Sequence, residues 1–505
     1  MRRLAASLLV LLIPAAASAE SVRLVDTLVL EWRGDNDDGV DTNDDYGVGL
    51  TKLYLSGDSE GTTVRAQVDA VKFTNFPDVP SPTLEEPSAY ASEARLERLS
   101  VTHSLGDLRL VLGDHPRQLG RGLALSMRKV DELGLDQALR GGAVEWDGEK
   151  VAAVVFAGRT NVANVDGVTQ KHLEDPDDTL AGASGTLHLG RAELSVHGLY
   201  LQAKQPVLPE LGDDSTTLGG AFLELPATQW LSLYLEGATE QYTIAGQTDG
   251  GSAAYATADL DLQLVSLLVE GLWLDRFQLL GSYDPVLQRR TPYNQPPTLE
   301  RIDQEVLDTQ DVKGGRAKLS RSFLEGDLVV YASGMFRRYG PEESLVDALH
   351  GYGGFELAYG AGHSRWNASA GYRQELQNDE PFKTMLHAET DWVQPVGGGN
   401  ALHLSVAHEA RSFQDRDYER GTTILGVDHS ELGSFSVELG YDTFNENTRQ
   451  LFLAALLTYQ ASDWLSLRSV VGSERGGIKC VGGVCRDFPA FSGARLEATV
   501  RHDLL

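Results

Sequence analysis

Basic residues gather in one stretch of an otherwise acidic chain. From Gly113 to Trp146 the sequence reads GDHPRQLGRGLALSMRKVDELGLDQALRGGAVEW, in a protein whose formal net charge is −30. Cationic side chains on a long loop can pair with carboxylates and narrow a passage, so the stretch is a candidate pore-constriction or selectivity element. The alternative interpretation is an inert plug held by ion pairs. The residues concerned are His115, Arg117, Arg121, Arg128, Lys129 and Arg140.

A second candidate site is an acidic loop near the N-terminus. Residues 34–45 read GDNDDGVDTNDD, and Asp35, Asp37 and Asp41 surround Gly39. Hard cations such as Ca²⁺ bind several carboxylate oxygens, so these three residues are a candidate calcium site. The spacing departs from the EF-hand order, and a solvated acidic loop is the alternative interpretation.

The two cysteines, Cys480 and Cys485, lie five positions apart. In an oxidising compartment two such thiols can close a small disulfide loop. Half a zinc site is the weaker alternative, because no histidine lies nearby. We predict a disulfide.

Catalytic motifs are absent from the sequence. We find no G-x-S-x-G, no H-E-x-x-H and no Walker loop, and His408-Glu409 lacks a second histidine four positions further on. We therefore expect a protein that is not an enzyme and that has no cofactor apart from the candidate calcium.

Hydrophobic alternation with a period of two runs along the whole chain. In the last segment, for example, Leu496, Ala498 and Val500 alternate with charged and polar residues. Strands point successive side chains to opposite faces, so each such segment has one apolar and one polar face. The segments are about 10 to 12 residues long, which suits a tilted strand that crosses a bilayer better than a soluble strand.

Short and long connections take turns between these segments. Short links such as Leu105–Gly106 and Leu189–Arg191 predict periplasmic turns, and longer polar connections predict extracellular loops. Twelve long connections imply twelve hairpins, hence an all-β, transmembrane antiparallel barrel of about 24 strands, within a range of 20 to 26. The long connections are Arg33–Asp45, Asn75–Tyr90, Asp114–Asp136, Asn161–Thr179, Lys204–Asp214, Ala245–Gly251, Tyr283–Asp311, Tyr339–Leu349, Gln377–Pro381, Gln414–Glu419, Asn445–Asn447 and Ser473–Arg486.

Aromatic residues lie near the ends of many expected strands. Such residues form girdles at the two membrane interfaces of a barrel, although ordinary core aromatics are the alternative. The residues are Tyr46, Tyr54, Trp230, Trp273, Tyr352, Trp366, Trp392, Tyr441 and Trp464.

The N-terminus predicts export from the cytoplasm. Arg2 and Arg3 precede a short apolar run, and Ala17-Ser18-Ala19 forms an A-x-A cleavage site before Glu20. We expect residues 1–19 to be a signal peptide and residues 20–505 to be a single barrel domain in the outer membrane of a diderm, Gram-negative bacterium. Its partners are then outer-membrane lipid and lipopolysaccharide, and the strong negative charge argues against nucleic acid.

Two motifs carry a resemblance to a known family. Gly113-Asp114, Gly120–Leu123 and Leu133–Gly141 form the first, and Tyr293–Leu299 (YNQPPTL) forms the second. On these motifs the chain resembles an uncharacterised family of large outer-membrane barrels best known from Bacteroidetes-type bacteria, which implies a barrel but no substrate. The region around Gly120 is also similar, more loosely, to alginate-type polysaccharide export barrels.

The sequence leaves three functions open. The leading one is a porin-like channel or conduit, in which net acidity would favour cations or neutral solutes. The second is an export or secretion barrel for polysaccharide or protein, which requires envelope export proteins as partners. The third is a plugged barrel that presents its loops for adhesion or envelope anchoring.

Overall fold

The computed structural model describes residues 20–37, 44–74, 87–284, 289–299, 311–341, 344–360, 363–414, 416–445, 448–481 and 484–504. The predicted signal peptide, residues 1–19, lies outside this range. None of the helices in the described part of the chain is long and apolar enough to span a membrane.

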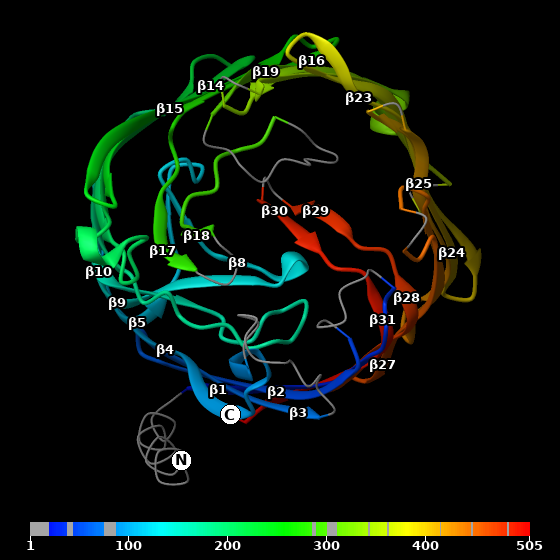
Figure 1. The fold of residues 1–505 in the computed structure, drawn as a ribbon, viewed down its shortest axis with the longest axis horizontal. Coiled ribbons are helices and arrows are strands. Elements are labelled where there is room, and N and C mark those ends of the chain that lie inside the picture. Colours follow the sequence, from blue (N-terminus) through cyan, green and yellow to red (C-terminus); the bar gives the residue numbers. More distant parts are fainter. Residues whose placement is uncertain are drawn as a thin grey trace.

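Twenty-four antiparallel strands close into a single ring, as predicted (Figure 1). Each strand pairs with the next wall strand along the chain, and β31 pairs with β1, where Leu30 lies opposite Leu496. Closure pairs the backbone groups that an open sheet edge would expose to lipid. The first twelve strands are β1 (Ser21–Arg33), β2 (Tyr46–Ser59), β3 (Thr62–Thr74), β4 (Glu93–Leu105), β5 (Leu108–His115), β9 (Leu135–Asp147), β10 (Val151–Val162), β11 (Thr179–Leu189), β12 (Ala192–Gln202), β13 (Ser215–Pro226), β14 (Leu231–Ile244) and β15 (Gln247–Asp261). The others are β16 (Ser266–Asp275), β19 (Val312–Phe323), β20 (Leu328–Tyr339), β21 (Val346–Tyr359), β22 (Ser364–Gln377), β23 (Glu380–Gly397), β24 (Asn400–Phe413), β25 (Arg416–His429), β26 (Gly433–Asp442), β27 (Leu451–Ser462), β28 (Leu465–Glu474) and β31 (Phe491–Asp503).

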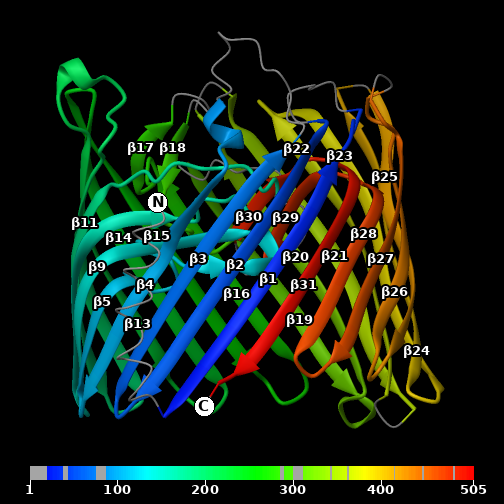
Figure 2. The same ribbon diagram turned by 90° about the horizontal axis from the view of Figure 1, so that it is seen from below.

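The strands are tilted, and the two ends of the barrel differ (Figure 2). Short turns such as Gly106–Asp107 lie at the end where β1 begins and β31 ends, which is the periplasmic end. Four connections at the other end are shorter than expected: β21 begins already at Val346, and three other connections have only two residues. Two of them, Ala245–Gly246 and Asn378–Asp379, are two-residue turns with positive φ at both residues, so the flanking strands run on into a tight hairpin. The third joins β24 to β25 at residues 414–415.

The outer face of the wall is apolar between aromatic residues. Trp366 near the periplasmic end and Trp273 near the extracellular end are both exposed on this face, as predicted for interfacial girdles. Tyr46 and Tyr352 do not belong to a girdle. Both are buried, because their positions in the alternation point them into the barrel, where Tyr46 packs against Phe73.

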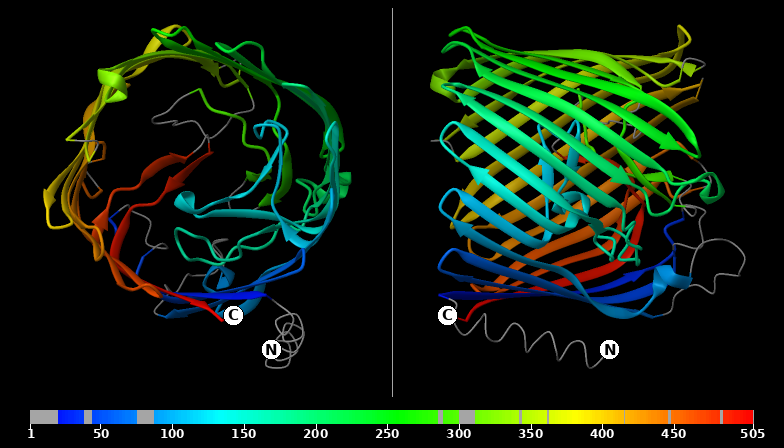
Figure 3. Two further views of the ribbon diagram at one scale, coloured as in Figure 1. Left: turned by 180° about the vertical axis from the view of Figure 1, so that it is seen from behind. Right: turned by 90° about the vertical axis from the view of Figure 1, so that its left-hand side faces the viewer.

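Four segments leave the extracellular end of the wall and fold inward (Figures 1 and 3). We name the described residues of 116–134, 163–178, 276–299 and 475–490 the first, second, third and fourth inserts. The largest apolar cluster of the protein forms where the first and third inserts meet the inner face of the wall, so the core lies within the lumen. The inserts contain β6 (Arg117–Leu119), β7 (Leu125–Met127), β8 (Lys129–Val130), η3 (Asp131–Leu133), β17 (Leu280–Asp284), β18 (Arg289–Pro292), β29 (Gly477–Val481) and β30 (Val484–Phe488); outside them lie η2 (Pro87–Tyr90), η4 (Pro209–Leu211) and η5 (Leu324–Gly326).

Candidate functional site in the barrel lumen

The turn of the first insert rests on the inner face of β14. The backbone N–H of Arg121 donates to the carboxylate of Glu236 at 3.0 Å and to the hydroxyl of Tyr234 at 3.1 Å. The Arg121 guanidinium lies 4.0 Å from the centre of the Tyr234 ring. A Cβ on Gly120 would lie 2.2 Å from the Glu236 carboxylate, and Gly120 has φ +54°. Glycine is therefore required where the insert meets the wall.

The two motifs behind the family resemblance meet in the lumen. The N–H of Ser126 donates to the carbonyl of Tyr293 at 2.8 Å, and the N–H of Gln295 donates to the carbonyl of Gly122 at 2.9 Å. The side-chain amide of Asn294 donates to the carbonyl of Leu123 at 3.0 Å. The third insert thus adds hydrogen bonds to the hairpin of the first, although the two are about 170 positions apart.

A buried carboxylate, Asp178, holds the second and third inserts together. It accepts hydrogen bonds from the Tyr293 hydroxyl at 2.7 Å, the Ser282 N–H at 2.8 Å and the Lys204 N–H at 2.9 Å. The Tyr293 hydroxyl also lies 2.9 Å from Thr160 Oγ1. Asp178 and Tyr293 are both fully buried. Sequence reasoning missed Asp178, because it is one of several acidic residues in a loop and nothing local distinguishes it.

Arg486 of the fourth insert ties together the first and second inserts. Its guanidinium donates to the carbonyls of Leu133 and Gly134 at 3.1 and 3.2 Å, and pairs with Asp166. Burial alone would raise the pKa of Asp166, but Arg486 and the donors of Thr169 outweigh burial and hold that pKa below its ordinary value. The four inserts therefore form one connected layer.

The barrel wall is interrupted beside the first insert. The ladder between β4 and β5 stops where Ser100 pairs with Gly113, and β5 ends at His115. Gly113 has φ +94°, and a Cβ there would lie 2.0 Å from the carbonyl oxygen of Leu99. The chain then turns inward, so that above this level β4 and β9 face each other without a backbone ladder between them.

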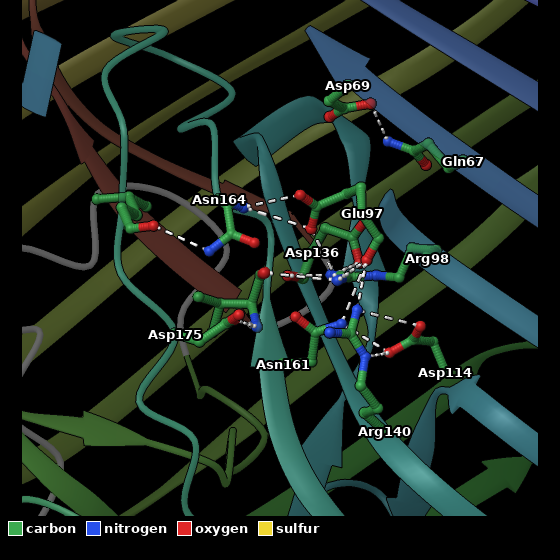
Figure 4. Close-up of polar contacts among 12 residues, drawn as sticks. Gln67, Asp69, Glu97, Arg98, Asp114, Asp136, Arg140, Asn161, Asn164 and Asp175 are labelled. Atoms are coloured by element: carbon green, nitrogen blue, oxygen red, sulfur yellow. Dashed lines mark hydrogen bonds and ion pairs between the residues drawn. The ribbon is translucent and has the colours of Figure 1, made fainter. Parts of the chain in front are cut away.

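Polar side chains close this gap between β4 and β9 (Figure 4). Arg140 donates to the carbonyl of Glu97 at 2.9 Å and to the carboxylate of Asp114 at 3.0 Å. Arg98 donates to the Asp136 carboxylate at 3.0 Å. These bonds satisfy groups that a regular sheet would pair through its backbone. Arg140 thus lies in the wall, and its predicted part in a constriction stays a prediction.

Two more of the predicted constriction residues lie against the inner wall. Arg117 donates to Glu145 at 2.5 Å, and its guanidinium lies 5.8 Å from the centre of the Phe156 ring. His115 is buried, with Nδ1 2.8 Å from the carbonyl oxygen of Gly113. Both residues have partners that fix the base of the first insert.

The remaining two constriction residues lie further along the first insert. Arg128 Nε is 3.5 Å from Gln295 Oε1 of the third insert. Lys129 pairs with Asp131 at 2.7 Å, and its side chain is 60% exposed. Its side chain is more exposed than those of Arg117 and Arg140, which also form ion pairs. The role of the six residues in a constriction stays a prediction.

The acidic N-terminal loop is described only in part. Asp41 lies outside the described residues. Asp37 accepts two hydrogen bonds from Arg449, at 3.0 and 2.6 Å, so a cation already neutralises it, and Asp35 accepts from the N–H of Asp37 at 2.7 Å. No group of three potential metal ligands occurs within the described part of the chain. Calcium binding stays a prediction.

The two cysteines lie on neighbouring strands of the fourth insert. Cys480 on β29 lies directly opposite Cys485 on β30 in the hairpin register. Directly opposite residues of an antiparallel pair are close enough for a disulfide, so the backbone suits the predicted bridge.

The wall from β20 to β25 carries a set of cationic side chains toward the lumen. Alternation along each strand directs these side chains inward. In Figure 1, β23–β25 lie on the right of the ring, whereas β17 and β18 lie near its left side. Sequence reasoning did not single them out, because they lie one to a strand. We name the following five residues the lumenal cationic cluster: Arg337, Arg373, Lys383, Arg411 and Arg420, among which lie Glu375 and Glu409.

Comparisons with known proteins support the fold. No protein-family model and no curated protein sequence matches the chain. Among solved structures, the siderophore receptor PirA from Pseudomonas aeruginosa matches 95% of this chain and 80% of its own, with 10% identity and a TM-score of 0.50. The E. coli P pilus tip assembly intermediate PapC-PapD-PapK-PapG matches 96% of this chain and 61% of its own, with 11% identity and a TM-score of 0.51. Acinetobacter baumannii OccAB1 matches 71% of this chain and 93% of its own, with 10% identity and a TM-score of 0.41.

The protein therefore has the fold of an outer-membrane β-barrel, a closed ring of 24 antiparallel strands. At such low identity the likeness establishes the architecture alone. The resemblance to one particular family of large barrels stays a prediction.

Proposed function

We propose that the protein is a porin-like conduit, through which small polar solutes cross the outer membrane along the β20–β25 side of the lumen. The observation that carries this proposal is the asymmetry of the lumen. In the part of the chain that the structure describes, hydrogen bonds join the inserts to β1, β2, β4, β9, β10, β14 and β31, whereas β20–β25 present charged side chains toward the lumen. A polar wall along a partly filled lumen is the usual design of a narrowed channel.

The inserts act in this proposal as a fixed constriction. Tyr293 and Asp178 are fully buried, and the bonds between the first and third inserts include two main-chain bonds and a bond from Asn294 to the carbonyl of Leu123. Undocking either insert would expose apolar surface and leave donors unpaired, so we infer that the inserts set the width of the passage and do not open for each solute.

A plugged structural barrel is the second candidate, because the same buried bonds would also hold a complete plug. An export barrel remains the third, and it would require periplasmic export proteins as partners. In the proposed conduit the barrel needs no cofactor and performs no reaction. Lipid and lipopolysaccharide are then its partners, against the apolar outer face.

Liposome swelling tests the proposal. Purified protein in liposomes should admit neutral sugars, at a rate that falls steeply with their size. No swelling with any sugar would favour the plugged barrel. Rapid swelling that does not depend on size would indicate a wide pore and contradict a fixed constriction.

A further inference from the structure

Two arginines face outward from the wall at β9 and β10. Val144 of β9 and Val155 of β10 lie directly opposite each other and are exposed on the outer face. Arg140 and Arg159 are each four positions closer to the extracellular end, so alternation directs them to the same face. The two strands lie on the left of Figure 1, the side that faces the viewer in the right panel of Figure 3.

The position of these arginines is costly if they meet only hydrocarbon. Arg140 lies directly opposite Arg159 in the ladder between β9 and β10. Directly opposite side chains on one face are about 5 Å apart at Cβ, and like charges in such a pair repel each other. Arg140 also lies near the middle of β9, where a charge on the lipid face of a barrel is unfavourable. Two apolar residues would suit a wall that only had to contact acyl chains.

The carboxylates that pair with these cations are less exposed than the cations. Arg140 pairs with Asp114 at 3.0 Å, and 47% of the Arg140 side chain but only 3% of the Asp114 side chain is exposed (Figure 4). Arg159 pairs with Asp177 at 2.8 Å, with exposed fractions of 63% and 27%. Lys204 shares Asp177 at 2.5 Å and is 56% exposed. The three side chains therefore present a cationic surface.

Both guanidinium groups keep donors for a further acceptor. Arg140 donates through Nε and Nη2, and Arg159 donates to Asp177 through Nη1. Within the described ranges, the other nitrogen atoms of the two groups have no hydrogen-bond partner. Asp213 does not occupy them, because it accepts from Gln202, two strands away from Arg159 in the same row. Guanidinium donors of this kind fit a phosphate group.

The surface below the arginines suits an acyl chain. The next outward row toward the periplasmic end runs from Leu112 to Tyr200, and both of these side chains are exposed. Between them the row has only Gly142, Ala157 and Ala181, so no bulky side chain covers the wall there. The outer face thus places a cationic surface directly above an apolar one.

We propose that the outer face of β9–β12 binds lipid A, with a phosphate group on Arg140, Arg159 and Lys204 and an acyl chain on the row below. A phosphate between the two arginines would offset their repulsion. Lipid A of the outer leaflet combines phosphate groups with acyl chains, and this combination matches the order of cationic and apolar surface. The site lies on the outer face, so the proposal does not depend on the proposed conduit.

Native mass spectrometry of the detergent-solubilised protein with added lipid A tests the site. The wild type should retain lipid A, and Arg159→Gln should weaken its binding about tenfold, because a charged hydrogen bond is lost. Equal dissociation constants for the two proteins would overturn the proposal.

Arg338→Gln is the matched control. Arg338 lies on the outer face of β20, two positions from the exposed Phe336, and its side chain is 50% exposed. It binds Asp347 with two hydrogen bonds, at 2.6 and 2.7 Å. Arg338→Gln should therefore bind lipid A as the wild type does. An equal loss in both variants would overturn the proposal, because any exposed cation would then serve.

Arg140→Gln should weaken binding as well, but Arg140 also closes the gap between β4 and β9. Arg159→Gln leaves every hydrogen bond across that gap in place, so it decides the question if Arg140→Gln fails to fold. Heat-modifiability on a gel verifies that each variant used is a folded barrel.

Three other ligands identify what the site recognises. Lipid A without its phosphate groups should bind about tenfold more weakly to the wild type, and equal binding would overturn the phosphate contact. Inorganic phosphate that competes as well as lipid A would overturn a lipid site, and phosphatidylglycerol that binds as tightly would overturn the assignment to lipid A. A wild-type dimer that Arg159→Gln abolishes would also overturn the proposal, because this face would then be a subunit interface.

Discussion

Replacing Tyr293 by phenylalanine removes one hydroxyl group from the point where the second and third inserts meet. The ring remains and still fills its fully buried site, so the change deletes hydrogen bonds with little change of packing. The lost bonds are the one to the Asp178 carboxylate, at 2.7 Å, and the one to Thr160, at 2.9 Å. We expect the third insert to undock more often from the second insert and from β10, and its bonds to the first insert to open with it.

The size of the effect follows from the partners that remain. A hydrogen bond to a charged group contributes about 1.5 to 3 kcal/mol, and an orphaned buried acceptor costs a similar amount. Asp178 keeps the donors of Ser282 and Lys204, so it is not orphaned and the loss falls near the middle of that range. We therefore expect about 2 kcal/mol, which is about a 30-fold change in the equilibrium for local opening.

Hydrogen exchange measures this opening directly. The N–H of Ser126 in the first insert donates to the carbonyl of Tyr293, and the N–H of Tyr293 donates to the carbonyl of Leu279 within the third insert. The protection of both N–H groups from exchange should fall about 30-fold in Tyr293→Phe, whereas the protection of the wall strands should not change. Tyr283→Phe is the matched control, because the Tyr283 hydroxyl has no hydrogen-bond partner among the described residues. Unchanged protection in Tyr293→Phe, or an equal fall in the control, would refute the reasoning.

Three further predictions follow from the inserts. Gly120→Ala should displace the first insert and raise its sensitivity to protease, whereas Gly106→Ala, also at positive φ but with open space around its Cβ, should not; equal sensitivity would contradict this. The pKa of Asp166 is lowered in the folded protein, so its pairing with Arg486 stabilises docking of the fourth insert above the ordinary pKa of the carboxyl group and is lost as pH falls through the lowered pKa. Hydrogen exchange of the fourth-insert hairpin should therefore stay slow from neutral pH to about pH 4. Loss of protection near pH 6 would contradict this prediction. Alkylation without reductant should label neither cysteine, and serine at both positions should lower the stability of the hairpin by about 2 kcal/mol, as measured by exchange.

The barrel follows from the sequence, because its signals are local. Alternation within each strand and polar turns between strands gave the 24-stranded ring and the faces of residues such as Leu496 and Arg495. Hairpins with two-residue turns were harder to place, since Ala245 and Asn378 adopt positive φ without a glycine or proline signal at the first turn residue.

The lumen could not be predicted in the same way, because its contacts join segments far apart in the chain. Gly120 and Tyr293 stood out as parts of motifs, but nothing in either motif says that they pack together. Asp178 looks like an ordinary charged residue in the sequence. Its importance comes from burial and from which partners the closed ring places beside it.

The central claim, a conduit narrowed by docked inserts, is tested most directly by single-channel recordings of the wild type beside Asp178→Ala. Removing this carboxylate leaves the donors of Tyr293, Ser282 and Lys204 without their acceptor, so the inserts should loosen while the wall stays intact. We predict small, stable conductance steps for the wild type and larger, fluctuating steps for Asp178→Ala. Identical steps in the two proteins, or no conductance from either, would contradict the account.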